Sequence, residues 1–223
     1  NQVSAAEQAV GWRLLWDGAT TAGWQGLLGA AFPPGVWSIR DGELIVGESG
    51  GKGRRGDLVT TEEFGAFEFQ AEFKLTPGAN SGIKYAVTGK DYPEAGPAVG
   101  LEFQVLDDER HPDAKLGAAG NRTLGSLYDL IPRNPLPGGL AIVPRVGEWQ
   151  HARLVVHRDG RVEHWLNGIK VVDYVRGSPL FAALVARSKF AKIEGYGLAP
   201  RGHLLLQDHG TEVHIRSLKI RSL

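Results

Sequence analysis

The chain contains neither cysteine nor methionine among its 223 residues. The absence of cysteine excludes disulfide bonds and thiolate chemistry. No apolar run approaches the ~20 residues that a membrane-spanning helix needs. Lysine plus arginine and aspartate plus glutamate each number 25, so there is no basic excess to neutralise a phosphate backbone. We therefore expect neither a membrane span nor nucleic acid as a partner.

The residues that are abundant suggest a compact, turn-rich protein. Glycine occurs 31 times and proline 12 times, and 42% of the residues are hydrophobic, enough for a substantial core. The first residues are polar and small, and no initiator methionine precedes them. We interpret them as the start of a mature chain after removal of a signal segment, with trimming as the alternative. This predicts a periplasmic or extracellular protein with a tail at 1–10 and one domain at 11–223.

Alternation of apolar and polar residues is the main structural signal. Residues 67–75 carry aromatic and aliphatic side chains at odd positions and polar side chains at even positions, which predicts a half-buried strand. Residues 101–106 alternate in the same way, and three further strands are predicted at 151–157, 161–166 and 169–174. Asp-Gly and Asn-Gly pairs follow several strands and favour tight hairpins.

The C-terminal third adds a helix and two strands. Ser178 is suited to cap a helix that begins at Pro179, and strands are predicted at 204–207 and 212–223. In the last of these, the apolar residues change parity near Arg216-Ser217, which predicts a β-bulge. Many short strands separated by turns indicate an all-β sandwich or barrel with one short helix. The long irregular segment 107–144 is of the kind that often carries function.

A series of short motifs then resembles one known family. They include Trp16-Asp17-Gly18, Trp37-Ser38-Ile39-Arg40-Asp41-Gly42, Gly56-Asp57-Leu58, Asn80-Ser81-Gly82-Ile83-Lys84-Tyr85, Glu102-Phe103-Gln104-Val105-Leu106-Asp107-Asp108, His111-Pro112-Asp113, Ser126-Leu127-Tyr128-Asp129, Gly147-Glu148-Trp149, His164-Trp165-Leu166-Asn167-Gly168, Ser188-Lys189-Phe190 and Gln207-Asp208-His209-Gly210. In this order, over about residues 11–223, the chain is similar to the 3-keto-disaccharide hydrolase domain family.

The resemblance implies a concanavalin A-like jelly roll, that is, a β-sandwich of two antiparallel sheets. It also implies a carbohydrate substrate, namely a glycoside whose sugar carries a ketone at C3. Such a ketone makes the C2 proton acidic, so a base can start an elimination that expels the glycosidic oxygen. The site then needs a base, a group that stabilises the enolate, and an acid or metal that assists departure.

Glu102 is the foremost candidate base. It shares one face of its predicted strand with Gln104, a candidate substrate-binding residue, about 7 Å along the strand. In a jelly roll the concave sheet presents such a row to the substrate. The alternative is that Glu102 is a solvated residue on an outer face.

His111 is the second catalytic candidate because its intrinsic pKa suits acid–base work near neutrality. A surface loop histidine is the alternative. Asp107, Asp108 and Asp113 lie near it in the sequence, and together with His111 they offer an alternative role as ligands of a divalent cation such as Ca²⁺, although the spacing is not that of an EF-hand.

Further candidates come from three segments. Lys84 is expected to stabilise the enolate if its face is concave, and to be an ordinary exposed lysine otherwise. Asn80 precedes a predicted turn at Ser81-Gly82 and is a candidate for substrate binding. His209 is a candidate acid–base group, whereas Asp208 also suits a hairpin turn.

Asp57 and Tyr128 are candidates for binding sugar hydroxyls. Lys189, at the end of the predicted helix, is expected to interact with the helix dipole and no more. None of the six tryptophans is assigned to the site, because aromatic residues of β-sandwiches are mostly core residues.

Two other functions fit the same fold class. A non-catalytic carbohydrate-binding module would need aromatic and amide groups more than a cluster of Glu, His and Lys. An endoglucanase-like hydrolase would need two carboxylates facing one way, but Gln104 and Leu106 follow Glu102 on its face. The titratable residues therefore favour an enzyme acting on a keto sugar.

Overall fold

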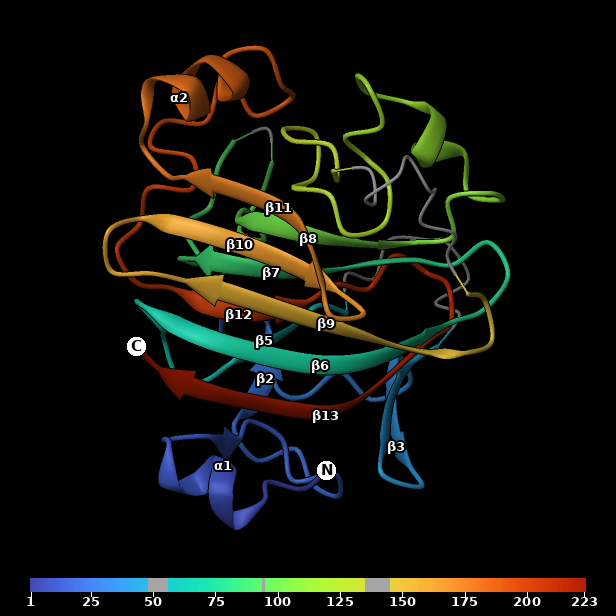
Figure 1. Ribbon diagram of the computed structural model, residues 1–223. Helices are drawn as coiled ribbons and strands as arrows, with labels where there is room; N and C mark the ends of the chain where they lie inside the picture. Colours follow the sequence, from blue (N-terminus) through green and yellow to red (C-terminus); the bar gives the residue numbers. More distant parts are fainter. Residues whose placement is uncertain (48–55, 94, 135–144) are drawn as a thin grey trace.

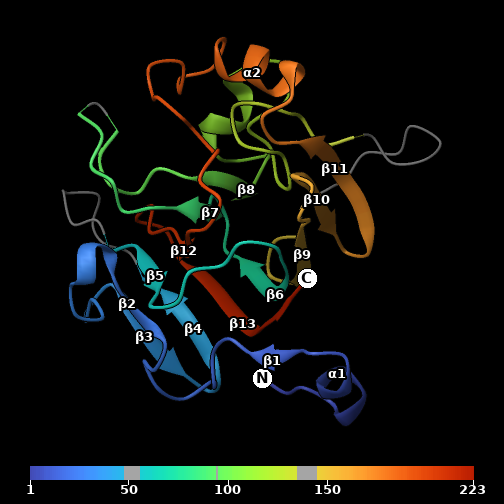
Figure 2. The same cartoon turned by 90° about the vertical axis from the view of Figure 1, so that its left-hand side faces the viewer.

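The computed structural model describes residues 1–47, 56–93, 95–134 and 145–223. Two antiparallel sheets pack face to face (Figures 1 and 2). The eight-stranded sheet has the order β11-β10-β9-β6-β13-β4-β3, with β1 also paired to β13, and the five-stranded sheet has the order β2-β5-β12-β7-β8. The predicted all-β sandwich with jelly-roll architecture is confirmed.

The strands have the following bounds: β1 Arg13–Leu14, β2 Trp24–Gly26, β3 Trp37–Arg40, β4 Glu43–Val46, β5 Leu58–Thr60, β6 Phe67–Leu75, β7 Asn80–Val87, β8 Leu101–Leu106, β9 Trp149–Val156, β10 Arg161–Leu166, β11 Ile169–Val175, β12 His203–Leu206 and β13 Val213–Ser222.

The core lies between the sheets and is built by the predicted alternation. Phe67, Phe69, Ala71 and Phe73 of β6 are buried on one side, facing Ile83 and Phe103 of the other sheet across a single cluster. Burial of this apolar surface is the main stabilising contribution to folding. Trp16, Trp24 and Trp37 belong to this core, whereas Trp149 and Trp165 are half-buried on the outer face of the eight-stranded sheet.

One buried polar network crosses the core. His164 of β10 contacts the Tyr85 hydroxyl through Nε2 at 2.9 Å, and that hydroxyl lies 2.8 Å from the hydroxyl of Tyr174. His164 Nδ1 lies 3.2 Å from the carbonyl oxygen of Gly125, which can only accept. The proton therefore belongs on Nδ1, Tyr85 donates to Nε2, and Tyr174 donates to Tyr85. Burial lowers the pKa of His164 to about 4, which keeps the ring neutral.

The two C-terminal strands occupy central positions. β12 lies between β5 and β7, and β13 lies between β6 and β4. The expected hairpin between them is wrong, because the strands belong to different sheets and residues 207–212 cross from one sheet to the other. The bulge expected near Arg216-Ser217 is confirmed: the register shifts after Arg216, and Ser217 has a φ of 55°.

Two of the Asp-Gly and Asn-Gly pairs, which the sequence analysis expected to form tight hairpins, have the geometry of such turns. Asp41-Gly42 and Asn167-Gly168 have positive φ at both residues, as a type I′ turn requires. At Asp159-Gly160 only the glycine has positive φ, and the turn is longer, with the His157 amide donating to the Arg161 carbonyl.

The helix α2, Pro179–Val185, begins as predicted, with Ser178 Oγ accepting from the Phe181 amide. A second helix, α1 at Ala5–Ala9, has a capping box between Ser4 and Glu7. It lies within the segment expected to be a tail. No helix among the residues described has the length and apolar character needed to cross a bilayer.

Candidate functional site

The outward-facing residues of β7 and β8 form the floor of the candidate site. Tyr85 and Phe103 point into the core, where both rings contact His164. Strand side chains alternate, so Gly82 and Lys84 of β7 and Glu102 of β8 face the opposite way. Lys84 lies directly across from Glu102 in the strand register. All six residues of β8 are buried, so this face of the sheet is covered. The alternative that Glu102 is a solvated residue on an outer face is therefore wrong.

Glu102 carries a buried carboxylate with few partners. Its nearest cation is Lys84, with Nζ 3.8 Å from Oε2, beyond hydrogen-bond distance. No described residue donates a hydrogen bond to this carboxylate. Burial raises the pKa of Glu102, and the nearby charges of Lys84, Lys189 and His209 act in the opposite direction. The result is a carboxylate that binds a proton more tightly than an exposed glutamate does.

Gly82 makes room for that carboxylate. A Cβ added at Gly82 would lie 2.3 Å from Oε1 of Glu102. The Glu102 side chain therefore lies across the neighbouring strand, over a position that only glycine can occupy without a clash. Ser81-Gly82 was expected to form a turn, and this is wrong: both residues lie in β7, which begins at Asn80, and the turn precedes the strand, with Gly78 at a φ of 75°.

The segment after β8 forms a wall of the site. The Gly125 amide donates to the Gln104 carbonyl at 2.8 Å, and the Gln104 amide donates to the Ser126 carbonyl at 3.2 Å. The Tyr128 amide donates to the Glu102 carbonyl at 3.0 Å, so this segment continues the sheet beyond β8. The Tyr128 hydroxyl donates to Asp113 Oδ2 at 2.9 Å. Tyr128 thus lies beside Glu102 with its ring orientation fixed at both ends.

Arg122 holds this wall together. It donates through Nη1 to Asp113 at 2.9 Å and through Nε to Asp129 at 2.7 Å. Asp129 also accepts from the backbone amide of Lys189 at 2.8 Å. A chain of ionic hydrogen bonds therefore joins the wall to the segment that follows α2.

Lys189 is the functional candidate that the sequence interpretation missed. Its Nζ lies 4.1 Å from the centre of the Tyr128 ring, and its charge is near enough to Glu102 to influence that carboxyl group. Partial desolvation lowers the pKa of Lys189, and Arg122 and Lys84 act in the same direction. Lys189 remains solvent-exposed, so a ligand can reach it. The motif Ser188-Lys189-Phe190 was visible in the sequence. Its place at the end of a predicted helix, however, indicated only an interaction of Lys189 with the helix dipole.

The two predicted histidines meet at the rim of the site. The ring centres of His111 and His209 are 6.4 Å apart. His209 is exposed and His111 is half-buried. Partial burial and the neighbouring His209 lower the pKa of His111, which favours its neutral form near neutral pH. His111 Nδ1 also accepts from the Asp113 amide, so its ring is oriented by the wall segment.

Asp57 and Asp208 connect two loops beside the floor. The Asp208 amide donates to Asp57 Oδ1 at 2.8 Å, and the Gly56 amide donates to Asp208 Oδ2 at 3.2 Å. The charge of Asp57 contributes to the raised pKa of Glu102. These two carboxylates hold the crossover that carries His209.

Asn80 and Gln104 lie on the same outward face but deeper. Both are almost fully buried, at 3% and 1% exposure. Oε1 of Gln104 accepts from the neighbouring Val105 amide, and Asn80 Oδ1 has no hydrogen-bond partner among the described residues. Their proposed contact with substrate stays a prediction.

The residues considered for a cation face other partners. Asp107 accepts from the amides of Gly78 and Glu109, and Asp108 accepts from Arg133 and the Leu124 amide. Within the described ranges, no three His, Asp or Glu side chains gather as a metal site would require. Residues 135–144 of the long loop lie outside the described residues.

Comparison with known proteins identifies relatives over almost the whole chain. Residues 11–221 match the family described as the 3-keto-α-glucoside-1,2-lyase-like domain. A protein of Bacteroides thetaiotaomicron named 3-keto-disaccharide hydrolase is 34% identical over 238 aligned positions, which cover 96% of this chain and 79% of that protein.

Solved structures with the same fold also cover almost the whole chain. A candidate glycosyl hydrolase of Parabacteroides distasonis superposes with a TM-score of 0.84 at 27% identity, covering 100% of this chain and 99% of the other. A second candidate glycosyl hydrolase of that organism has a TM-score of 0.61 at 25% identity, covering 90% and 99%. A carbohydrate-binding module of Bacillus subtilis, at 13% identity, shares the fold alone, with a TM-score of 0.52 and coverage of 90% and 96%.

Proposed function

Because this chain belongs to the 3-keto-α-glucoside-1,2-lyase-like domain family, we propose that it cleaves glycosides whose sugar ring carries a ketone at C3, with Glu102 as the base. The observation that supports this most is the Glu102 carboxylate: buried, without a hydrogen-bond donor among the described residues, and 3.8 Å from a lysine ammonium. A desolvated carboxylate with raised pKa is a stronger base than one in water.

The reaction balances without an added oxidant or reductant. The base takes the C2 proton, and the electrons of the C2–H bond pass to the C3 oxygen as an enolate. They return to form the C1–C2 double bond as the C1–O bond breaks. The leaving alkoxide takes up a proton. In hydrolysis, water then adds its hydroxyl to C1 and a proton to C2.

The cations of the site suit the negative charge that develops on the C3 oxygen. Lys84 is held at the floor by its contact with the Ala98 carbonyl at 3.2 Å, and Lys189, in the segment that follows α2, lies beside Tyr128 of the wall. A preorganised ammonium in a poorly solvated site stabilises an enolate more strongly than water does. Lys84 and Lys189 together supply this stabilisation in our proposal.

His209 is the group we assign to protonate the leaving oxygen. It is exposed at the rim, where the departing sugar or alcohol would lie, and its charge reaches Glu102. His111, whose ring centre lies 6.4 Å away, is held neutral and oriented, as a partner that exchanges protons with His209 should be.

The test compares a 3-keto-glucoside bearing a chromogenic leaving group with the same glucoside unoxidised. Release from the keto substrate alone supports the proposal. The reaction in D₂O distinguishes the routes, because elimination followed by hydration places deuterium at C2 of the product, whereas direct displacement at C1 does not. An uncatalysed sample corrects for exchange of the product itself.

Glu163→Gln is the matched control for Glu102→Gln. Glu163 is also a largely buried strand glutamate, at 8% exposure, but lies on the opposite sheet beside Arg161. Loss of keto-glycoside cleavage in Glu102→Gln with activity kept in Glu163→Gln supports the assignment. Equal release from both glucosides would contradict the keto requirement, and full activity of Glu102→Gln would exclude Glu102 as the base.

A further inference from the structure

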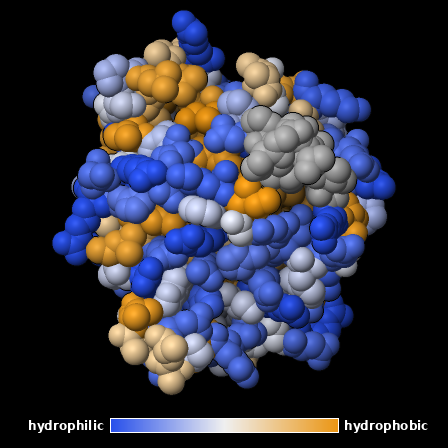
Figure 3. All heavy atoms as spheres, in the orientation of Figure 1, coloured by the Kyte–Doolittle hydropathy of each residue, from blue (hydrophilic) through white to orange (hydrophobic). Residues whose placement is uncertain are grey.

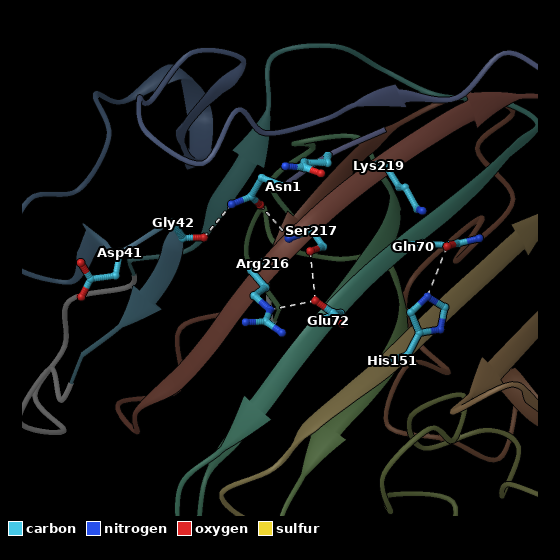
Figure 4. Close-up of a pocket in the computed structure, with 10 residues that line it drawn as sticks. Asn1, Asp41, Gly42, Gln70, Glu72, His151, Arg216, Ser217 and Lys219 are labelled. Carbon is cyan, nitrogen blue, oxygen red and sulfur yellow. Dashed lines mark hydrogen bonds and ion pairs between the residues drawn. The ribbon is translucent and has the colours of Figure 1, made fainter. Parts of the chain in front are cut away.

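A pocket lies on the outer face of the eight-stranded sheet, on the opposite side of the sandwich from the site described above. It has a volume of about 480 Å³, within the ~300–1,000 Å³ typical of small-molecule sites. Its floor consists of side chains from β6, β9 and β13, and the N-terminal residues close one side (Figure 4). Figure 3 shows the hydrophilic surface of this sheet, seen in the orientation of Figure 1.

Several walls of this pocket are held in place by hydrogen bonds. Asn1 donates to the Gly42 carbonyl at 2.8 Å and accepts from the Ser217 amide at 2.7 Å. Glu72 Oε2 accepts from Arg216 Nε at 2.8 Å and from Ser217 Oγ at 3.0 Å. The Arg216 guanidinium also packs 3.9 Å from the centre of the Trp149 ring. A ligand would therefore meet preorganised groups, which lowers the entropy cost of binding.

His151 and Gln70 offer a matched donor and acceptor. Nε2 of His151 lies 3.2 Å from Oε1 of Gln70, an oxygen that can only accept. The proton is thus on Nε2, which makes Nδ1 an acceptor, while the Gln70 amide nitrogen supplies donors. Burial lowers the pKa of His151, which favours this neutral form. A neutral acceptor beside an amide donor suits hydroxyl groups, which both donate and accept.

The charged side chains of the lining balance. Arg216 and Lys219 carry two positive charges, and Glu72 and Asp41 carry two negative charges. An anion would meet the carboxylates and a cation would meet the arginine and lysine, while an apolar ligand would leave the polar lining without partners. The remaining class is a neutral molecule rich in hydroxyl groups.

We propose that this pocket is a second carbohydrate-binding site, one that takes a neutral, unoxidised sugar unit and performs no cleavage. The pocket lies on the outer face of the eight-stranded sheet and Glu102 on the outer face of the five-stranded sheet, with the core between them. Figure 2 shows the two sheets as separate layers. One protein can therefore hold a glycan on one face while the other face remains open to substrate. The proposal is independent of the keto-glycoside chemistry.

The test is titration of the ¹⁵N-labelled protein with maltotetraose and with cellotetraose. The expected result is saturable shifts of the backbone amides at Gln70, His151 and Arg216. His151→Ala and Gln70→Ala should each weaken the affinity by about tenfold, as loss of a hydrogen-bond pair predicts. Lys170→Ala, at the far edge of the same sheet, and Glu102→Gln should bind normally, and His151→Ala should keep its activity on the keto substrate.

Other outcomes would overturn the proposal. Shifts confined to Lys84, Glu102 and their neighbours would mean that the sugars enter only the first site. Absence of saturable shifts with both sugars, or stronger binding of a sulfated tetrasaccharide, would exclude a site for neutral sugars. If His151→Ala fails to fold, the wild-type shift map and the Gln70→Ala affinity still decide the matter.

Discussion

Two equally buried glutamates show how differently the outer faces of the two sheets use charge. Glu68 on the eight-stranded sheet has a side chain 4% exposed and accepts hydrogen bonds from Arg153 and Arg221. Glu102 on the five-stranded sheet is 6% exposed, and its nearest cation is 3.8 Å away. The first carboxylate is saturated and stabilises the sheet. The second accepts no hydrogen bond from a described residue, and in our proposal it receives the substrate proton.

Removal of the Glu102 charge should have the largest effect on activity. Glu102→Gln should lower kcat by about 10³-fold, within the ~10²–10⁴ range of general-base contributions. The melting temperature should stay level or rise, because a poorly satisfied buried charge is lost. In the unmodified protein, activity should fall as the pH drops through the raised pKa of Glu102, since only the carboxylate accepts the proton. Steady-state rates across pH and thermal melts check both points.

The core between the faces should respond to acid. His164 binds a proton below pH 6.5 when unfolded but only below about 4 when folded. Stability should therefore fall as the pH drops from 6.5 to 4, by about 3 kcal/mol in total. Urea unfolding at several pH values measures this loss, and His164→Phe should flatten it. An unchanged slope in His164→Phe would mean that other groups dominate acid unfolding.

Glu68 should show the opposite pattern to Glu102. Glu68→Gln leaves Arg153 and Arg221 without their carboxylate, and both arginines are about a third exposed, so water offsets part of the loss. The unfolding free energy should decrease by roughly 2 kcal/mol, with keto-glycoside cleavage unchanged. Paired denaturation and rate measurements test this. A fall in kcat comparable to that of Glu102→Gln would contradict the assignment of Glu68 to stability and of Glu102 to catalysis.

Gly82→Ala should sharpen the comparison without altering a charge. The added Cβ would displace the Glu102 carboxylate from its position over β7. We expect kcat to fall by roughly tenfold, because small displacements of a catalytic group already cost about this much or more. Gly78→Ala is unsuitable as a control because Gly78 has positive φ, so Ser81→Ala on the same strand serves instead. Equal rates in Gly82→Ala and wild type would contradict the spatial role of Gly82.

The sequence revealed most of the fold because local patterns determine it. Alternation identified β6 and β8, and Asp-Gly and Asn-Gly pairs located two hairpins. The sheet assignment of β12 and β13 could not be read locally, since a connection of six residues fits a hairpin as well as a crossover. Only long-range pairing with β5 and β6 separates the two.

The residues of the candidate site were likewise predictable where local patterns place them and unpredictable where long-range contacts do. Glu102 and Lys84 were identified from strand parity, and the register of β7 and β8 places them directly across from each other. Lys189 was missed because it reaches the site through the Asp129–Arg122–Asp113 chain, whose members are distant in sequence. Gly82 was assigned to a turn because the sequence does not show why a glycine is needed. A glycine that leaves room for a side chain of the neighbouring strand cannot be distinguished there from a glycine in a turn.

The central placement of the last two strands bears on how the protein forms on the ribosome. Among the described strands, β12 alone joins β2 and β5 to β7 and β8, and β13 alone joins β3 and β4 to β6, β9, β10 and β11. Until residues 203–222 have been synthesised and have left the exit tunnel, each sheet remains as two separate pieces with exposed edges. The two pieces of each sheet can therefore join only after residues 203–222 have emerged, whereas β7 and β8, which form the floor that carries Glu102, pair with each other directly.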